Sequence, residues 1–232
     1  YEENPAELWS ALRDAVTTTS REPTRYALNC LQLRGCGDIV ATDGHHILVQ
    51  AGFVLPWTGA LLIPAKSVLG CKDLDTGEPV RVGLAGDWLT FAIGPWSISL
   101  KINRDARFPN IDDCIPRSEA ATSHLTIEPS DAEFLRHSLP GLPCNDAQYE
   151  PITLDLNGRV IVRGQGDSQS RASELLLSNS RLDGEAIQLS SNRQYLARAL
   201  AMGFRQFHIS SADAPILGQD ERRRYLWALL SM

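Results

Sequence analysis

Apolar side chains at helical spacing begin the chain. Leu8, Leu12 and Val16 fall on one face of a helix predicted for residues 5–18, and Pro5 suits its first turn. Beyond this helix, apolar residues alternate with polar ones or form short runs bounded by glycine and proline, which predicts strands. The first half should hold strands at 26–33, 39–49, 61–63, 80–84, 88–93 and 96–102, and a short helix from 64 to about 74.

The second half shows a similar order of patterns. Pro129 begins a predicted helix that has Leu135 and Leu139 on its apolar face. Further along, the pair Asn157-Gly158 is typical of a two-residue hairpin turn. A second helix is predicted for 191–202. The predicted strands are 152–156, 160–162, 175–177, 186–189, 206–209, 216–217 and 225–230.

The two halves therefore resemble a duplicated unit. Equivalent positions are separated by a nearly constant number of residues: 124 between Pro5 and Pro129, 123 between Leu31 and Leu154, and 126 between Pro64 and Ser190. Such an offset favours an internal repeat over the alternative, a single irregular α+β domain. We predict an α+β fold of two domains, 1–118 and 119–232, each with two helices backing an antiparallel sheet.

Composition narrows the class of protein. In 232 residues, 43% are hydrophobic and 22% charged, which suits a folded globular chain. No apolar run approaches the roughly 20 residues of a membrane-spanning helix. The five cysteines are scattered and form no C-x-x-C pair, so free thiols in a reducing cytoplasm are expected. The net charge of -6 excludes a uniformly basic surface but allows one basic face.

The segment Asp43-Gly44-His45-His46 is the one cluster that suggests enzymatic chemistry. A carboxylate and two imidazoles are metal ligands, given a third protein ligand. If the strand continues through this segment, however, His45 and His46 point to opposite faces. The favoured interpretation is a tight turn in which Asp43 accepts hydrogen bonds from backbone amides and Gly44 takes an unusual dihedral. No metal or other cofactor is predicted.

Other catalytic constellations are missing from the sequence. The remaining histidines, His124, His137 and His208, stand far from one another along the chain and are interpreted as isolated. The chain has no nucleophile-elbow, phosphate-loop or dinucleotide-binding motif. Gly164-Gln165-Gly166 and Asp112-Asp113 are interpreted as loops. The chain is therefore not expected to be an enzyme.

Basic residues on or beside the predicted helices are candidates for contact with a phosphate backbone. Arg198 and Arg205 are seven residues apart and so lie near one helical face, while Arg25-Tyr26 places a cation beside an aromatic ring. An ordinary solvated surface would explain the same residues. The candidate DNA-binding set is Arg13, Arg25, Tyr26, Lys66, Lys72, Arg107, Arg136, Arg193, Arg198 and Arg205.

Five short segments, at four places along nearly the whole chain, resemble the beta subunit of bacterial DNA polymerase III, the replicative sliding clamp. The most specific is Ala41-Thr42-Asp43-Gly44-His45, which is similar to the family's A-T-D-G-H. Residues 24–29 are similar to the family's R-Y-x-L-N, and 62–66 to its strand-to-helix step. Residues 107–110 are similar to its R-F-P stretch, and 225–232 to its C-terminal strand. The resemblance is to the second and third of the family's three domains.

The resemblance implies a ring-shaped processivity factor. Helices would line a hole around duplex DNA and contact its backbone without sequence preference. Clamp rings of this kind have six domains, so a two-domain chain would form a homotrimer, or a dimer if an N-terminal domain is missing. The first residue is not methionine, which leaves that question open. Implied partners are DNA polymerase, other clamp-binding proteins and a clamp loader, at the nucleoid in the cytoplasm.

The resemblance also implies a groove that holds a short apolar peptide of such partners. Two positions differ from the family, because His46 and Asp113 stand where arginine is frequent. The family's Met-Pro-Met-Arg is replaced by Ala-Leu-Leu-Ser at 228–231. We therefore expect altered peptide preference. The matching positions are Leu28, Thr42, Gly44, His45, His46, Ile47, Pro109, Asp113, Cys114, Ala214, Pro215, Leu226, Trp227, Ala228, Leu229 and Leu230.

Two alternatives to the replicative clamp stay open. One is a protein of the same fold that has left replication and acts as an interaction or regulatory module, for which the thin basic complement leaves room. The other is a metal-dependent enzyme built on Asp43, His45 and His46.

Overall fold

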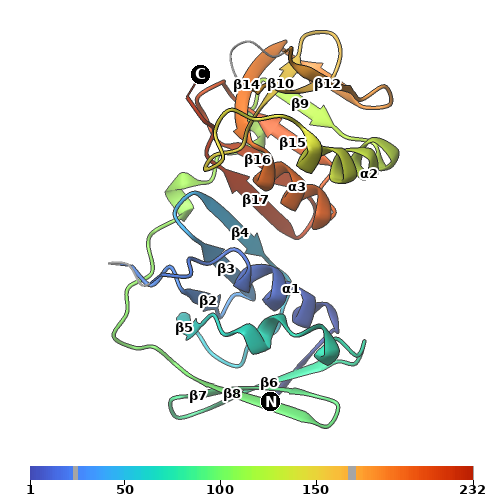
Figure 1. Ribbon diagram of the computed structural model, residues 1–232. Helices are drawn as coiled ribbons and strands as arrows, with labels where there is room; N and C mark the ends of the chain where they lie inside the picture. Colours follow the sequence, from blue (N-terminus) through green and yellow to red (C-terminus); the bar gives the residue numbers. More distant parts are fainter. Residues whose placement is uncertain (23–25, 167–170, 232) are drawn as a thin grey trace. The chain divides into compact units, whose positions relative to one another are not determined.

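The computed structural model describes residues 1–22, 26–166 and 171–231 of the chain. The chain divides into two compact units (Figure 1). The first comprises Tyr1–Asp112 with Arg222–Arg224, and the second comprises Asp113–Glu221 with Tyr225–Met232. Each unit is described separately below.

The first unit contains one α-helix among its described residues and two antiparallel sheets. In one sheet the order is β4-β3-β2-β5, and in the other it is β1-β6-β7-β8. The elements are β1 (Glu2–Asn4), α1 (Glu7–Val16), β2 (Cys30–Arg34), β3 (Asp38–Thr42), β4 (His46–Gln50), β5 (Ala60–Pro64), the 3-10 helices η1 (Ser67–Gly70) and η2 (Lys72–Leu74), β6 (Val80–Ala85), β7 (Trp88–Ile93) and β8 (Trp96–Lys101).

The apolar face of α1 joins the two sheets of this unit into one core. Leu8 and Leu12 are almost fully buried in a cluster with Leu31 of β2 and Phe91 of β7. Burying each such side chain contributes roughly 1.5–3 kcal/mol. Trp9 adds a hydrogen bond, in which its Nε1 donates to the carbonyl oxygen of Cys71 at 3.1 Å. The helical spacing seen in the sequence is therefore the spacing that fills this core.

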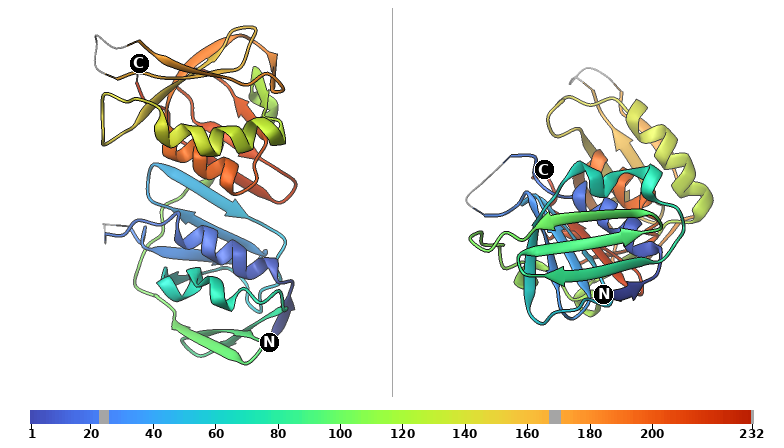
Figure 2. Two further views of the ribbon diagram at one scale, coloured as in Figure 1. Left: turned by 45° about the vertical axis from the view of Figure 1, so that its right-hand side comes forward. Right: turned by 90° about the horizontal axis from the view of Figure 1, so that it is seen from below.

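The second unit repeats this plan. Its sheets have the orders β12-β11-β10-β14 and β13-β9-β15-β16-β17. Helices α2 and α3 contact each other and run side by side (Figure 2). The elements are η3 (Asp112–Cys114) at the boundary, η4 (Ser118–Ala120), β9 (Ser123–Thr126), α2 (Pro129–Ser138), η5 (Leu139–Gly141), β10 (Pro151–Leu156), β11 (Ile161–Gly164), β12 (Ser173–Leu176), β13 (Arg181–Gly184), β14 (Ile187–Asn192), α3 (Arg193–Ala201), β15 (Gln206–Ile209), β16 (Ile216–Gln219) and β17 (Arg223–Trp227).

The strand orders confirm the internal repeat. The order β4-β3-β2-β5 in the first unit has the same connectivity as β12-β11-β10-β14 in the second, and β1-β6-β7-β8 has that of β9-β15-β16-β17. Strand β13 is an addition at one edge, where its residues pair with β9. The constant sequence offset therefore reflects two copies of one topology, although each copy has two sheets where one had been expected.

Three details differ from the predictions. Residues 39–49 do not form one strand, because the chain reverses between β3 and β4. The helix expected from Pro64 is instead the pair of short 3-10 helices η1 and η2, so the first unit has one α-helix where two were predicted. The short strands β1, β9 and β13 had not been predicted.

Candidate nucleic-acid interface and partner surface

The turn between β3 and β4 is built around Asp43. Its Oδ1 accepts hydrogen bonds from the backbone N–H groups of His45, at 2.8 Å, and of His46, at 3.0 Å. The hydroxyl of Thr42 accepts from the N–H of Gly44 at 3.0 Å and donates to the carbonyl oxygen of His46 at 2.7 Å. Gly44 has a φ of 99°, which favours glycine. The predicted turn is confirmed.

The same turn explains why the histidines differ. The His46 side chain is buried, and its Nε2 lies 3.3 Å from Oδ2 of Asp43, whereas His45 is exposed. Burial raises the pKa of Asp43, but hydrogen bonds and the charge of His46, together with the two N–H groups, outweigh it and lower that pKa. Within the described residues, no group of three or more histidine, cysteine, aspartate or glutamate side chains could hold a metal ion. The strand does not continue through this segment, because β3 ends at Thr42, the chain turns at 43–45, and β4 begins at His46.

The predicted groove residues are distributed over both units. In the first unit, Leu28 lies beside the turn, because a Cβ added to Gly44 would be 3.7 Å from its Cδ1. Pro109 is half-buried, and Thr42 and Ile47 are buried. In the second unit the partly or fully exposed members are Asp113, Cys114, Ala214, Pro215, Ala228, Leu229 and Leu230.

Trp227 is a correction to that set, because it is a core residue. Its side chain is 1% exposed, and its Nε1 donates to the hydroxyl of Ser191 at 2.9 Å. Its ring also packs against Phe207 and Tyr225, at centroid distances of 6.1 and 5.4 Å. Trp227 and the buried Leu226 therefore support this part of the second unit from within instead of facing a partner.

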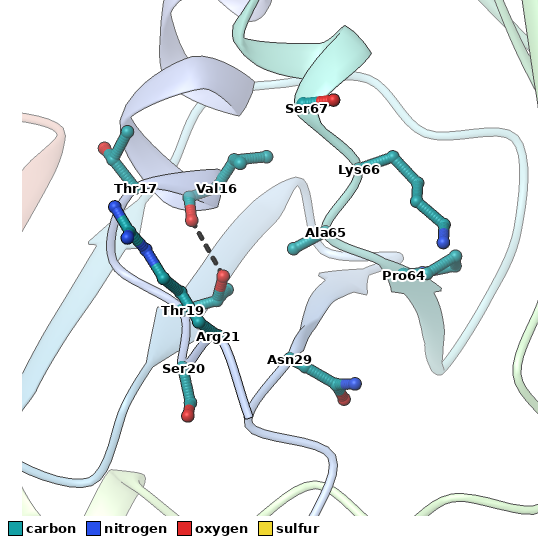
Figure 3. A pocket seen from close by; sticks show the side chains of 10 residues that line it. All are labelled: Val16, Thr17, Thr19, Ser20, Arg21, Asn29, Pro64, Ala65, Lys66 and Ser67. Atoms are coloured by element: carbon teal, nitrogen blue, oxygen red, sulfur yellow. Dashed lines mark hydrogen bonds between the residues drawn. The ribbon is translucent and has the colours of Figure 1, made fainter. Parts of the chain in front are cut away.

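Three candidate DNA-binding cations of the first unit, Arg13, Lys66 and Lys72, lie on or beside α1, η1 and η2. Arg13, at the end of α1, is ion-paired with Asp75 at 2.7 Å. Lys66 is exposed at a pocket of about 530 Å³ that is also lined by Arg21 and Asn29 (Figure 3). Arg21 was not among the predicted cations, although it is a basic residue close in sequence to the candidate Tyr26. Lys72, Tyr26 and Arg107 are exposed too.

The cations of the second unit are less available. Arg136, on α2, is ion-paired with Glu133 at 2.9 Å. Arg205, after α3, donates to the carbonyl oxygens of Leu200 and Phe204, and Arg198 is half-buried.

Arg193 is a correction to the DNA-binding set. Its side chain is buried, and its Nη1 donates to the carbonyl oxygens of Leu139 and Leu142 at 2.9 and 2.7 Å. Because those bonds tie η5 to α3, the guanidinium is not available to a phosphate. The candidate Arg25 lies outside the described residues.

His124 and His208 also need a correction, because they are not isolated. They lie directly opposite each other on β9 and β15, and their Nδ1 atoms are 2.9 Å apart. No local pattern could predict this contact, since the two residues are 84 positions apart.

The fold defined by these units is that of the bacterial DNA sliding clamp, which confirms the predicted fold class. No family model and no curated protein sequence matches the chain. Solved structures do. A DNA polymerase sliding clamp from Pseudomonas aeruginosa matches 100% of this chain and 66% of its own, with a TM-score of 0.82 at 19% identity.

Two further sliding clamps show the same likeness. DNA polymerase III subunit beta from Borrelia burgdorferi covers 100% of this chain and 64% of its own, with a TM-score of 0.85 at 13% identity. The beta sliding clamp of Caulobacter crescentus covers 99% and 65%, with a TM-score of 0.79 at 19% identity. The chain thus spans about two thirds of the length of these clamps. None of the helices in its described residues has the length and apolarity that crossing a membrane requires.

The Asp43 turn leads to a stability prediction. Replacing Asp43 with alanine removes the acceptor of two N–H groups and the carboxylate beside the His46 ring, so the free energy of unfolding should fall by about 2 kcal/mol at neutral pH. The pKa of Asp43 is lowered from 3.8, so its contribution is present above that value and is lost as the pH falls through the lowered pKa. Urea denaturation between pH 7 and pH 3 measures this.

The matched control is Asp43→Asn, which keeps an oxygen acceptor but no titrating group. It should lose less stability than Asp43→Ala, and the difference between wild type and Asp43→Ala should shrink below about pH 4. Equal losses in the two variants at every pH would contradict this account of the turn.

Proposed function

We propose that this protein is a DNA sliding clamp, a non-catalytic ring that encircles duplex DNA and tethers replication or repair proteins to it. The observation that carries the proposal is the doubled clamp topology, which covers the entire chain and superimposes on bacterial clamps with TM-scores of 0.79 to 0.85. Clamps act by topology and not by a reaction, so a clamp needs no catalytic constellation.

The number of units supports a particular assembly. A ring of six units requires three copies of a two-unit chain, joined head to tail by two different surfaces. If the natural protein carries a further N-terminal domain, two copies would complete the ring. The proposed assembly of the chain of 232 residues is a homotrimer.

Two sheet edges suit such a joint. Strand β8 ends one sheet of the first unit, and β12 ends one sheet of the second. Both strands are mostly exposed, and each carries a large apolar side chain in solvent, Trp96 at 56% and Leu176 at 47% exposure. An exposed strand edge pairs readily with another strand. By contrast, Leu230 donates to the carbonyl oxygen of Ser190 on β14, which covers that edge.

Placing a charge at one of these edges should weaken assembly. We expect Leu176→Asp to raise the dissociation constant for self-association at least tenfold, because a carboxylate would be buried without a partner. Sedimentation velocity over a concentration series measures the shift towards monomer. The matched control is Phe134→Asp, which alters a residue of similar exposure, 45%, on α2. If Leu176→Asp assembles as the wild type does, the edge proposal fails.

The small number of exposed basic side chains near the helices would suit a ring that slides along DNA. Lys66, Lys72 and Arg21 are exposed, but Arg13 and Arg136 are already paired with Asp75 and Glu133. Few free cations give weak, salt-sensitive and sequence-independent attraction to phosphates. Retention on DNA would therefore depend on enclosure more than on affinity.

That dependence gives the experiment that tests the function. Assembled protein, loaded onto nicked circular DNA with a clamp loader, should co-elute with the circle in gel filtration and be lost after a restriction enzyme linearises it. The physical reason is that only a closed ring on a closed circle cannot diffuse off. Equal retention on circular and linear DNA would indicate ordinary binding and contradict the proposal. Loading of a known clamp in parallel shows that the loader is active.

Partner docking is proposed for the surface around the Asp43 turn. Leu28 and Gly44 adjoin there, and the neighbouring Thr42 and Ile47 are buried behind them. Polymerases, other clamp-binding proteins and a clamp loader are the proposed partners. The exposed Asp113 would alter the peptide preference directly, and the buried His46 would act through the turn that it shares with Asp43.

A second candidate function is a clamp-fold interaction or regulatory protein outside replication. The observation favouring it is that few of the candidate basic side chains can reach a phosphate. Arg193 is buried, and Arg205 donates to backbone carbonyl oxygens. Such a protein would self-assemble and bind partners, yet show no difference between circular and linear DNA.

A further inference from the structure

Two imidazoles that belong to none of the candidate sets above meet on a sheet of the second unit. His124 of β9 and His208 of β15 are directly opposite in antiparallel strands, so their side chains share one face of the sheet. Their Nδ1 atoms are 2.9 Å apart, and the rings are nearly perpendicular, at 82° and 5.1 Å between centroids. Both side chains are half-buried.

This pair lies on the face of the sheet that also carries Leu217 of β16, which is opposite His208 and is buried. The neighbours along the strands, Leu125 on β9 and Phe207 and Ile209 on β15, point inward and are buried. On the histidine face, Asp183 of β13 lies opposite His124. It is exposed and ion-paired with Arg181 at 3.3 Å. The pair thus adjoins solvent on one side.

The imidazole pair can present two nitrogen lone pairs to a metal ion after one proton moves within one ring. A neutral imidazole has one N–H, so the contact requires one Nδ1–H donor and one Nδ1 lone pair. Burial and the charge of His124 lower the pKa of His208, although Glu119 acts in the opposite direction. Moving the donor's proton to Nε2 would leave both Nδ1 lone pairs free, without any change in net charge. The second torsion of histidine is soft enough for both rings to turn towards a common point.

We propose that His124 and His208 form a two-imidazole site for a divalent transition metal, with Cu(II) and Ni(II) fitting best. Metal–imidazole bonds of about 2.0–2.1 Å place two ligands about 2.9 Å apart at a right angle, and about 3.4 Å apart at the tetrahedral angle. The 2.9 Å between the Nδ1 atoms is that of an imidazole–imidazole hydrogen bond, so the two rings are already close enough to share one ion once both have turned. Imidazole ligands with solvent in the remaining positions suit Cu(II) and Ni(II).

The rest of the coordination would come from solvent. Within the described residues no third histidine, cysteine or carboxylate joins the pair in a metal-binding group. The site is therefore open and of moderate affinity, and a bound ion would fasten β9 to β15. This inference does not depend on the proposed clamp function, because it rests on the second unit alone.

The test is titration of the metal-free full chain with one equivalent of CuSO₄, followed by electron paramagnetic resonance. The expected spectrum is tetragonal Cu(II) with hyperfine coupling to two imidazole nitrogens. Isothermal titration should give one site per chain. His124→Gln and His208→Gln should each weaken binding at least tenfold, while the control His137→Gln, an exposed histidine on α2, should stay within twofold of wild type.

A measurement on the wild-type protein does not depend on whether the glutamine variants fold. Substoichiometric Ni(II) should broaden the NMR resonances of the His124 and His208 imidazoles before those of His45 and His137. Broadening of the exposed histidines first, or equal Cu(II) affinity in wild type and both glutamine variants, would overturn the proposal.

Discussion

Each unit depends on burying the inner faces of two sheets against helices in a single apolar layer. In the first unit, Leu12 of α1 meets Leu31 from one sheet and Phe91 from the other, and all three are almost fully buried. Because the inner faces of the strands are buried in that layer, they cannot contact a partner. What remains is the solvent side of the helices, the outer faces of the sheets, and the terminal strands. The proposed DNA contacts, metal site and assembly edges lie on those three surfaces.

The sequence predicted much of this fold because apolar periodicity reports which side faces the core. Strands β7 and β15 were predicted with the bounds that the structure shows, and α2 begins at Pro129 as expected. The prediction was wrong at 39–49, where apolar residues continue through a reversal that Asp43 stabilises with hydrogen bonds. Periodicity cannot report such a turn, because the turn lies between two buried strands. The short strands β1 and β13 were missed because they contain mostly exposed polar residues.

The site was less predictable, because its properties depend on partners far away in the sequence. Arg13 is paired with Asp75, which is 62 positions away, and this reduces its availability to DNA. Arg193 looked like a helical surface cation, yet it donates to the carbonyl oxygens of a loop more than 50 residues earlier. The meeting of His124 and His208 follows from strand register, which a single sequence does not specify when the face is polar. The Asp43 turn was predictable, because aspartate and glycine act through local hydrogen bonds.

The two clamp units of one chain are proposed to close into a ring with other copies. Strands β8 and β12, which end sheets of the first and the second unit, are the two surfaces proposed to join the copies head to tail. Native mass spectrometry of the chain at micromolar concentration tests this most directly. The account predicts a dominant species of three times the 25.5 kDa of one chain, without larger open oligomers. A single species at 25.5 kDa across the concentration range would contradict it.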